Sequence, residues 1–188
     1  MIRSEYLSDL RHKAREIRNE VQKEFYFLES EDLRRRPAKG KWNVIEVFAH
    51  INIFQAFYIK HISKALEKAP DVEHDNTEIS WLGSKFIKSM EPKEDGVIPF
   101  KMPTFSKADP LKRAKKGIVV NEKVVFSDFI SDIEEMEELI IKSYDKDITA
   151  IKVPTFLPLL KLTIADALGF NMAHVERHLQ QAKNIIEE

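Results

Sequence analysis

Apolar residues recur at steps of three and four along four long stretches of the chain, which is the period of an amphipathic α-helix. The first stretch runs from about Ser4 to Leu28, and charged residues fill most of its other face. The second begins at Asn43 and runs to about residue 68, the third begins near Ser127, and the fourth runs from Thr163 to about residue 186. Asn43 and Thr163 are each followed three residues later by an acidic residue, which is the signature of a capping box. The pattern predicts four long helices.

Residues 70–126 form the least regular part of the chain. Prolines at positions 92, 99, 103 and 110 and a glycine at 96 interrupt any long period. A short helix from Ser80 to Met90 is predicted, with Trp81, Phe86 and Ile87 as its apolar contacts. A loop of this length is usually a lid, a binding loop or an interface arm.

These elements predict an all-α fold. We expect one domain over residues 1–188, a four-helix bundle with a long irregular insertion between the second and third long helices. Only five glycines in 188 residues argue against a turn-rich β fold. Residues 152–158 are predicted to be a short extended connector before the fourth helix.

Composition excludes several classes of function. The formal net charge is −1, so no global field attracts nucleic acid. The basic run at 107–116 has no interleaved aromatic residues, which favours a solvated loop over an anion contact. Because the chain has no cysteine, it has no disulfide, thiolate ligand or cysteine nucleophile. No membrane span or signal peptide is recognisable. We expect a cytoplasmic protein without a nucleic-acid or membrane partner.

Three histidines have the spacing of a metal site. His174 and His178 are four residues apart on the predicted fourth helix, so they point the same way, one turn apart. His50 lies on the buried face of the predicted second helix. If the two helices pack together, three imidazoles converge on one divalent ion and leave a ligand position open, as in catalytic sites. From geometry alone, hydrogen-bonded core histidines remain the alternative. His61 lies roughly 16 Å along the axis from His50 and is too far to be a fourth ligand.

Two glutamates lie near the histidines. Glu46 precedes His50 by four residues and shares its face. It is either the capping partner of Asn43 or a catalytic candidate, acting as a general base or as an acceptor for a ligand imidazole. Glu176 lies about 200° around the helix from His174 and is expected to face solvent.

At these residues the sequence resembles the DinB/YfiT-like superfamily of metal-dependent enzymes. Residues 36–50 resemble the family's Trp-Ser/Thr-x-x-Glu-x-x-x-His segment, with Asn43 in place of the usual hydroxyl residue. Residues 174–182 are similar to its His-x-x-x-His-x-x-Gln ending. The resemblance implies a four-helix bundle, often a homodimer, with nickel, zinc or a similar divalent ion. Residue by residue, the implied ligands are His50, His174 and His178.

The resemblance also implies a reaction class. Members of the wider superfamily are linked to transfer or isomerisation chemistry with low-molecular-weight thiols such as bacillithiol and mycothiol. We therefore expect thiol-dependent S-transferase chemistry on a small-molecule substrate, with specificity residing in residues 70–126. Two alternatives stay open. One is a metal-dependent hydrolase with water as the nucleophile, and the other is a non-catalytic metal-binding or stress-response bundle protein.

Overall fold

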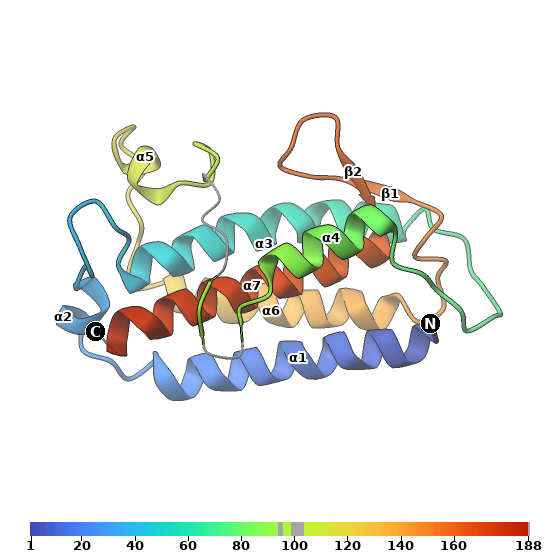
Figure 1. The fold of residues 1–188 in the computed structure, drawn as a ribbon, viewed down its shortest axis with the longest axis horizontal. Helices are drawn as coiled ribbons and strands as arrows, with labels where there is room; N and C mark the ends of the chain where they lie inside the picture. The colour runs from blue at the N-terminus through green and yellow to red at the C-terminus, as the bar shows by residue number, and fades with distance from the viewer. Residues whose placement is uncertain (94–95, 99–103, 188) are drawn as a thin grey trace.

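A computed structural model describes residues 1–93, 96–98 and 104–187, and it is almost entirely helical (Figure 1). In chain order the elements are α1 (Arg3–Glu24), α2 (Ser30–Arg34), α3 (Val44–Leu66), α4 (Trp81–Met90), α5 (Pro110–Ala114), α6 (Val125–Lys142), β1 (Lys152–Pro154), β2 (Lys161–Thr163) and α7 (Ile164–Glu187). The predicted all-α class is confirmed, and the four long helices fall where the apolar periodicity placed them.

The four long helices, α1, α3, α6 and α7, lie side by side along the long axis of the molecule (Figure 1). Helix α3 packs on α6 and α7, and α1 packs on the same two helices from the other side. Each helix turns its apolar stripe to the common core, because burying that stripe is the main stabilising term for an amphipathic helix. The residues of α1 that do so are Leu7, Leu10, Ala14, Ile17 and Val21.

Both predicted capping boxes are present. The Asn43 side chain accepts the Glu46 N–H at 2.9 Å, and the Glu46 carboxylate accepts the Asn43 N–H at 3.0 Å. At the start of α7, the Thr163 hydroxyl accepts the Asp166 N–H at 3.1 Å, and Asp166 accepts the Thr163 N–H at 3.2 Å. These bonds satisfy N–H groups that a helix start leaves without partners. They fix where the two histidine-bearing helices begin.

The segment after α3 returns across α7 through helix α4. Ser80 caps α4, and both its N–H and its hydroxyl donate to the Asp166 carboxylate at 2.8 Å. Gly83 lies directly over that carboxylate, because a Cβ there would stand 2.1 Å from Asp166 Oδ1. Gly169 of α7 likewise lets the Ile87 side chain approach closely. Two glycines thus allow α4 to lie close against α7.

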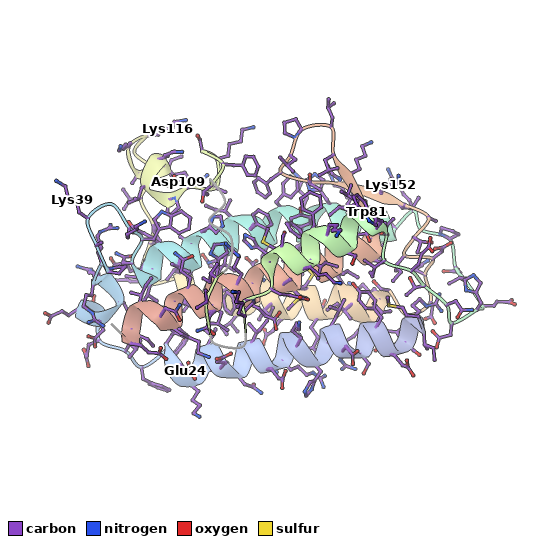
Figure 2. The ribbon with its side chains drawn as sticks, viewed as in Figure 1. Glu24, Lys39, Trp81, Asp109, Lys116 and Lys152 are labelled. Atoms are coloured by element: carbon purple, nitrogen blue, oxygen red, sulfur yellow. The ribbon has the colours of Figure 1, made fainter. Side chains whose placement is uncertain are left out.

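Two details of the insertion and the connector differ from expectation. Trp81 was expected to be an apolar contact of the short helix, but it is 76 % exposed (Figure 2). Phe86 and Ile87 do pack against the core, and Met90 of the same helix is buried in it. The predicted connector at 152–158 contains the first strand and the start of the turn of a small antiparallel hairpin, in which Lys152 pairs with Thr163 and Pro154 with Lys161. The short helices α2 and α5 were not predicted. Prolines 99 and 103 lie outside the described residues.

Candidate metal centre

The three histidines meet between α3 and α7. His50 comes from the first half of α3, and His174 and His178 come from successive turns of α7. One ring nitrogen from each lies within 4.8 Å of the other two. Nε2 of His50 and Nε2 of His174 lie 3.2 Å apart. Residues separated by 124 positions in the sequence therefore present their ring nitrogens to one point.

The second nitrogen of two of these rings is fixed by a hydrogen bond. Nδ1 of His50 donates to the Ala108 carbonyl at 2.7 Å, and Nδ1 of His178 donates to Oε1 of Gln181 at 2.9 Å. A carbonyl oxygen can only accept, so the proton of each neutral ring must be on Nδ1. Nε2 then carries the free lone pair, which is the form that ligates a metal. Within the described part of the chain, Nδ1 of His174 has no hydrogen-bond partner.

Burial keeps the three imidazoles neutral. His50 and His174 are each 4 % exposed, whereas His178 is partly exposed. Burial lowers the pKa of His50, and it lowers the pKa of His174 and of His178 still further. Charge repulsion within the group adds to burial for the two α7 rings. Three uncharged nitrogen donors are therefore available at neutral pH, and the His178 side faces solvent.

Aromatic rings line the centre. Phe54 stacks on the His174 ring with centroids 3.7 Å apart and an interplanar angle of 12°. Phe156, from the hairpin, stacks in turn on Phe54 at 4.6 Å. On the other side, the Trp42 ring lies 5.0 Å from that of His50. These rings pack against the imidazoles and contribute to the burial of His50 and His174.

Helix α5 and the turn before it lie above the N-terminal half of α3, where Asp109 is labelled in Figure 2. This turn supplies the Ala108 carbonyl that accepts from His50. Sequence reasoning missed this contact because a main-chain carbonyl has no side-chain signature. It also missed Gln181, although the Gln of the family motif falls on that position.

The predicted catalytic candidate Glu46 has other contacts. Its carboxylate accepts the Asn43 N–H and pairs with the Arg36 guanidinium at 2.6 Å. Among the described residues, the acceptor for His50 is Ala108 rather than Glu46. Glu176, expected to face solvent, is partly buried in an ion pair with Lys13 of α1 at 2.8 Å.

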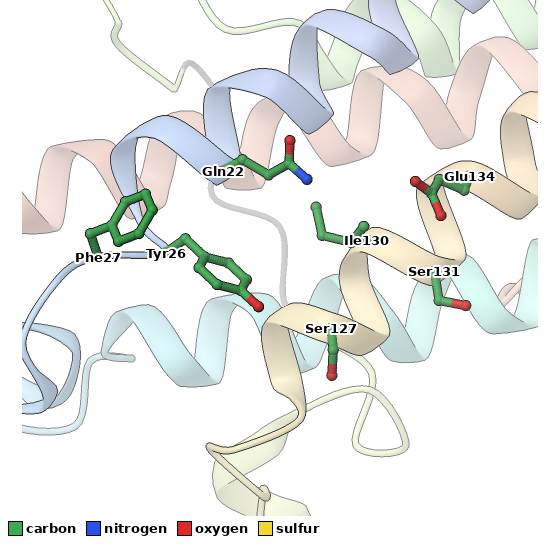
Figure 3. A pocket seen from close by; sticks show the side chains of 7 residues that line it. All are labelled: Gln22, Tyr26, Phe27, Ser127, Ile130, Ser131 and Glu134. Atoms are coloured by element: carbon green, nitrogen blue, oxygen red, sulfur yellow. The ribbon is translucent and has the colours of Figure 1, made fainter.

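The other histidine of α3 and a surface cavity lie apart from the centre. His61 donates from Nδ1 to the Phe57 carbonyl of its own helix. A cavity of about 510 Å³ lies between the end of α1 and the start of α6, and Figure 3 shows its lining side chains, among them Tyr26, Phe27 and Glu134. No histidine lines this cavity, so it is a separate feature of the surface.

Comparison with known proteins supports the resemblance seen in the motifs. No helix of the described residues has the length and apolarity needed to cross a membrane. No curated protein and no solved structure shows a significant match to the chain. The model of the DinB superfamily matches residues 14–182, which include all three histidines and most of the chain. The chain therefore belongs to the DinB superfamily.

Proposed function

We propose that this protein is a metal-dependent enzyme that carries out S-transferase chemistry with a small thiol. The observation that carries the proposal is the convergence of three ring nitrogens, from His50, His174 and His178, within 4.8 Å. Among the described residues, no other group of three histidine, aspartate or glutamate side chains converges in this way. We further propose that residues 1–188 form one four-helix bundle domain, with residues 70–126 as an insertion that shapes the substrate site.

The donor set suits a borderline divalent ion. Three neutral imidazoles without a carboxylate favour zinc or nickel over magnesium or calcium, which prefer oxygen. Hydrogen bonds from Nδ1 to Ala108 and to Gln181 orient two rings and leave Nε2 as the ligand atom. Three protein ligands are also fewer than the four that close a structural zinc site. The residues present therefore fit a catalytic ion.

A divalent ion in this position supplies Lewis acidity, which lets water or a thiol act as a nucleophile at neutral pH. The chain has no cysteine, so a thiol nucleophile must come from solution. Phe54 stacks on the buried His174 ring, and the partly exposed His178 leaves its own edge of the centre accessible. The side chains thus favour entry of a small substrate at the His178 edge.

Metal binding can be measured with Trp42 as the reporter. The chain has two tryptophans, and the second, Trp81, is exposed on α4. In a Trp81→Phe background, nickel should quench Trp42 fluorescence and titrate to one ion per chain. His174→Ala should lose this titration and keep its helical circular dichroism, whereas the matched control His61→Ala should keep both. Full metal content in His174→Ala would overturn the ligand assignment.

The reaction is tested with a panel of thiols and electrophiles, using metal-loaded and metal-stripped protein. We expect metal-dependent conjugation that is lost in His50→Ala. Turnover without a thiol would support the hydrolase alternative. Metal binding without turnover of any electrophile by thiol or water would support the non-catalytic alternative.

The catalytic role of Glu46 stays a prediction with its own test. Glu46→Gln keeps the side-chain length but removes the charge that pairs with Arg36. A general base predicts a large loss of turnover at unchanged metal content. A capping role alone predicts a lower melting temperature with turnover retained.

We also propose a homodimer, on the strength of the family resemblance. Light scattering should give about twice the chain mass of 21.9 kDa. A monomer at high protein concentration would contradict the proposal.

A further inference from the structure

Arg177 lies beside the histidine centre as a buried cation without a counterion. The residue is 6 % exposed, and its Nη1 has no hydrogen-bond partner among the described residues. No carboxylate of the described chain forms an ion pair with it. Arg3, which is equally buried, also has an Nε without a hydrogen bond, but its Nη1 donates to the Lys146 carbonyl and its Nε lies 3.8 Å from the Asp75 carboxylate, so its charge has a counterion.

The position of Arg177 on α7 places it next to the centre. It is three residues from His174, so the two side chains are neighbours on the helix surface, with Cβ atoms about 5–6 Å apart. It directly precedes His178. Its positive charge adds to burial in lowering the pKa of both histidines. Two groups of one small molecule could therefore contact Arg177 and the ring nitrogens at the same time.

Other charged groups near Arg177 are already paired. Glu176, its neighbour in sequence, is engaged by Lys13 on α1. On the side of α4, Ile87 packs against Gly169, and Asn184 donates to the Gly96 carbonyl, and neither contact involves a charged group. Lys183, on the next turns of α7, pairs with Glu20. Nothing among the described residues neutralises the Arg177 guanidinium.

A buried guanidinium nitrogen that lacks a partner, such as Nη1 of Arg177, is costly, because it has lost hydration without gaining a hydrogen bond. Such a cost is tolerated where the group serves binding. We propose that Arg177 binds a carboxylate of the substrate and holds it while the reacting atom lies at the three histidines. This inference rests on the proposed function, and it adds the substrate class: a small molecule bearing a carboxylate.

The chemistry of the side chain favours a carboxylate over a phosphate. A guanidinium offers two parallel N–H donors, which match the two oxygens of one carboxylate. A phosphate carries more charge and is usually held by several cations or by a helix N-terminus. Among the described residues, Arg177 is the unpaired buried cation at this centre. The single positive charge of Arg177 therefore suits a ligand with one carboxylate.

Binding is tested first without any reaction. Propionate is titrated into metal-free Trp81→Phe protein and followed by Trp42 fluorescence and melting temperature, with propionamide as the neutral control at matched ionic strength. We expect propionate to bind and propionamide not to bind. Arg177→Met should weaken propionate binding at least about tenfold, the scale of a hydrogen bond to a charged group. Lys88→Gln, which removes an exposed charge from α4, should bind propionate like the parent.

Stability gives a second measurement. Methionine keeps much of the apolar stem of Arg177 but removes the unpaired charge, so Arg177→Met should melt at or above the parent temperature. Arg177→Lys should recover only part of the binding, because an ammonium is not a planar fork. Equal propionate affinity in the parent and Arg177→Met would overturn the inference, and so would an Arg177→Met protein that fails to fold.

The carboxylate can belong to the thiol or to the electrophile, and matched pairs distinguish the two. Thioglycolate is compared with 2-mercaptoethanol, and iodoacetate with iodoacetamide, on zinc-loaded protein. In each case sulfur displaces iodide from carbon, a C–S bond forms, the C–I bond breaks, and the thiol proton passes to buffer. Preference for the charged member of one pair, lost in Arg177→Met, identifies the source. Arg177-dependent propionate binding without turnover would disprove the proposed function alone. Turnover with charged and neutral members alike would disprove the carboxylate subsite alone.

Discussion

The amide of Gln181 sits one turn beyond His178 and accepts its Nδ1 proton. An acceptor of this kind fixes the ring and raises the basicity of the other nitrogen, so its loss typically weakens metal binding 10- to 100-fold. We expect Gln181→Ala to raise the dissociation constant for zinc by about that factor. Gln180→Ala is the matched control, because Gln180 bonds Asn184 instead of a histidine. Equal zinc affinity in the two variants would contradict the assignment.

Asp132 on α6 is a partly buried carboxylate whose surroundings disfavour its charged form. Burial raises its pKa to about 7, and the nearby charges of Asp128 and Glu135 add to the rise. The folded pKa lies above the ordinary value of 3.8, so the folded state holds the proton more tightly. Stability therefore falls as pH rises from about 4 to about 7, and the full penalty remains above that window.

Asp132→Asn should consequently stabilise the protein at pH 8 by about 1–2 kcal/mol, a figure reduced for the partial exposure of the side chain. The gain should disappear near pH 4. Urea unfolding at both pH values measures it, with Glu138→Gln on the same helix as the control. A gain of equal size at both pH values would show that the charge is not the cause.

At this scale the sequence predicted the three converging rings but not all their neighbours. His50, His174 and His178 could be placed together because helical period puts each on the buried face of its helix. The Ala108 carbonyl could not be anticipated, since its position depends on how residues 104–110 fold over α3. The sequence also could not show that Arg177 Nη1 lacks a hydrogen-bond partner, because this depends on how the helices pack.

At the scale of elements, the contact between α4 and α7 depends on Gly83, which has no side chain. The Asp166 carboxylate occupies the space beside Gly83 and accepts from Ser80 and Thr163. Gly83→Ala would force a methyl group into a well-packed contact, which usually costs about 1–3 kcal/mol. We expect a lower melting temperature, with Lys88→Ala on the exposed face nearly unchanged. Unaltered stability in Gly83→Ala would mean that α4 is loosely attached.

The hairpin, like the short helices α2 and α5, could not be predicted from the sequence pattern. Its strands have three residues each, too few for a period of two to be recognised. Its turn contains Leu159 at φ 67°, where a glycine or asparagine is the usual signal. The helices were predictable because their apolar stripes span many turns. Their capping residues, Asn43 and Thr163, also located the starts to within a residue.

For the molecule as a whole, an ion on the three histidines would join α3 to α7. A ligand that binds only the folded state stabilises it by about 2.7 kcal/mol at 100 times its dissociation constant. For a chain of this size, that is a rise in melting temperature of about 5–10 °C. Differential scanning calorimetry with and without zinc should show the rise, and His174→Ala should abolish it. The rise should persist through the ordinary imidazole pKa of about 6.5 and shrink only at lower pH, because burial lowers the pKa of all three rings and protons then compete less for their nitrogens. A zinc-induced rise in His174→Ala equal to that of the parent would refute the link.

The hydrogen bond from His50 to Ala108 also affects which substitutions the protein can tolerate during evolution. Every amino acid has a main-chain carbonyl, so a substitution at 108 does not delete the acceptor. Ala108 is fully buried, however, and only a small side chain fits there. The exposed side chains around it, such as Lys107 and Lys112, carry no such restriction. The insertion can therefore acquire new surface chemistry by mutation while the ring below keeps its orientation, so the surroundings of this centre can change while its three histidines stay the same.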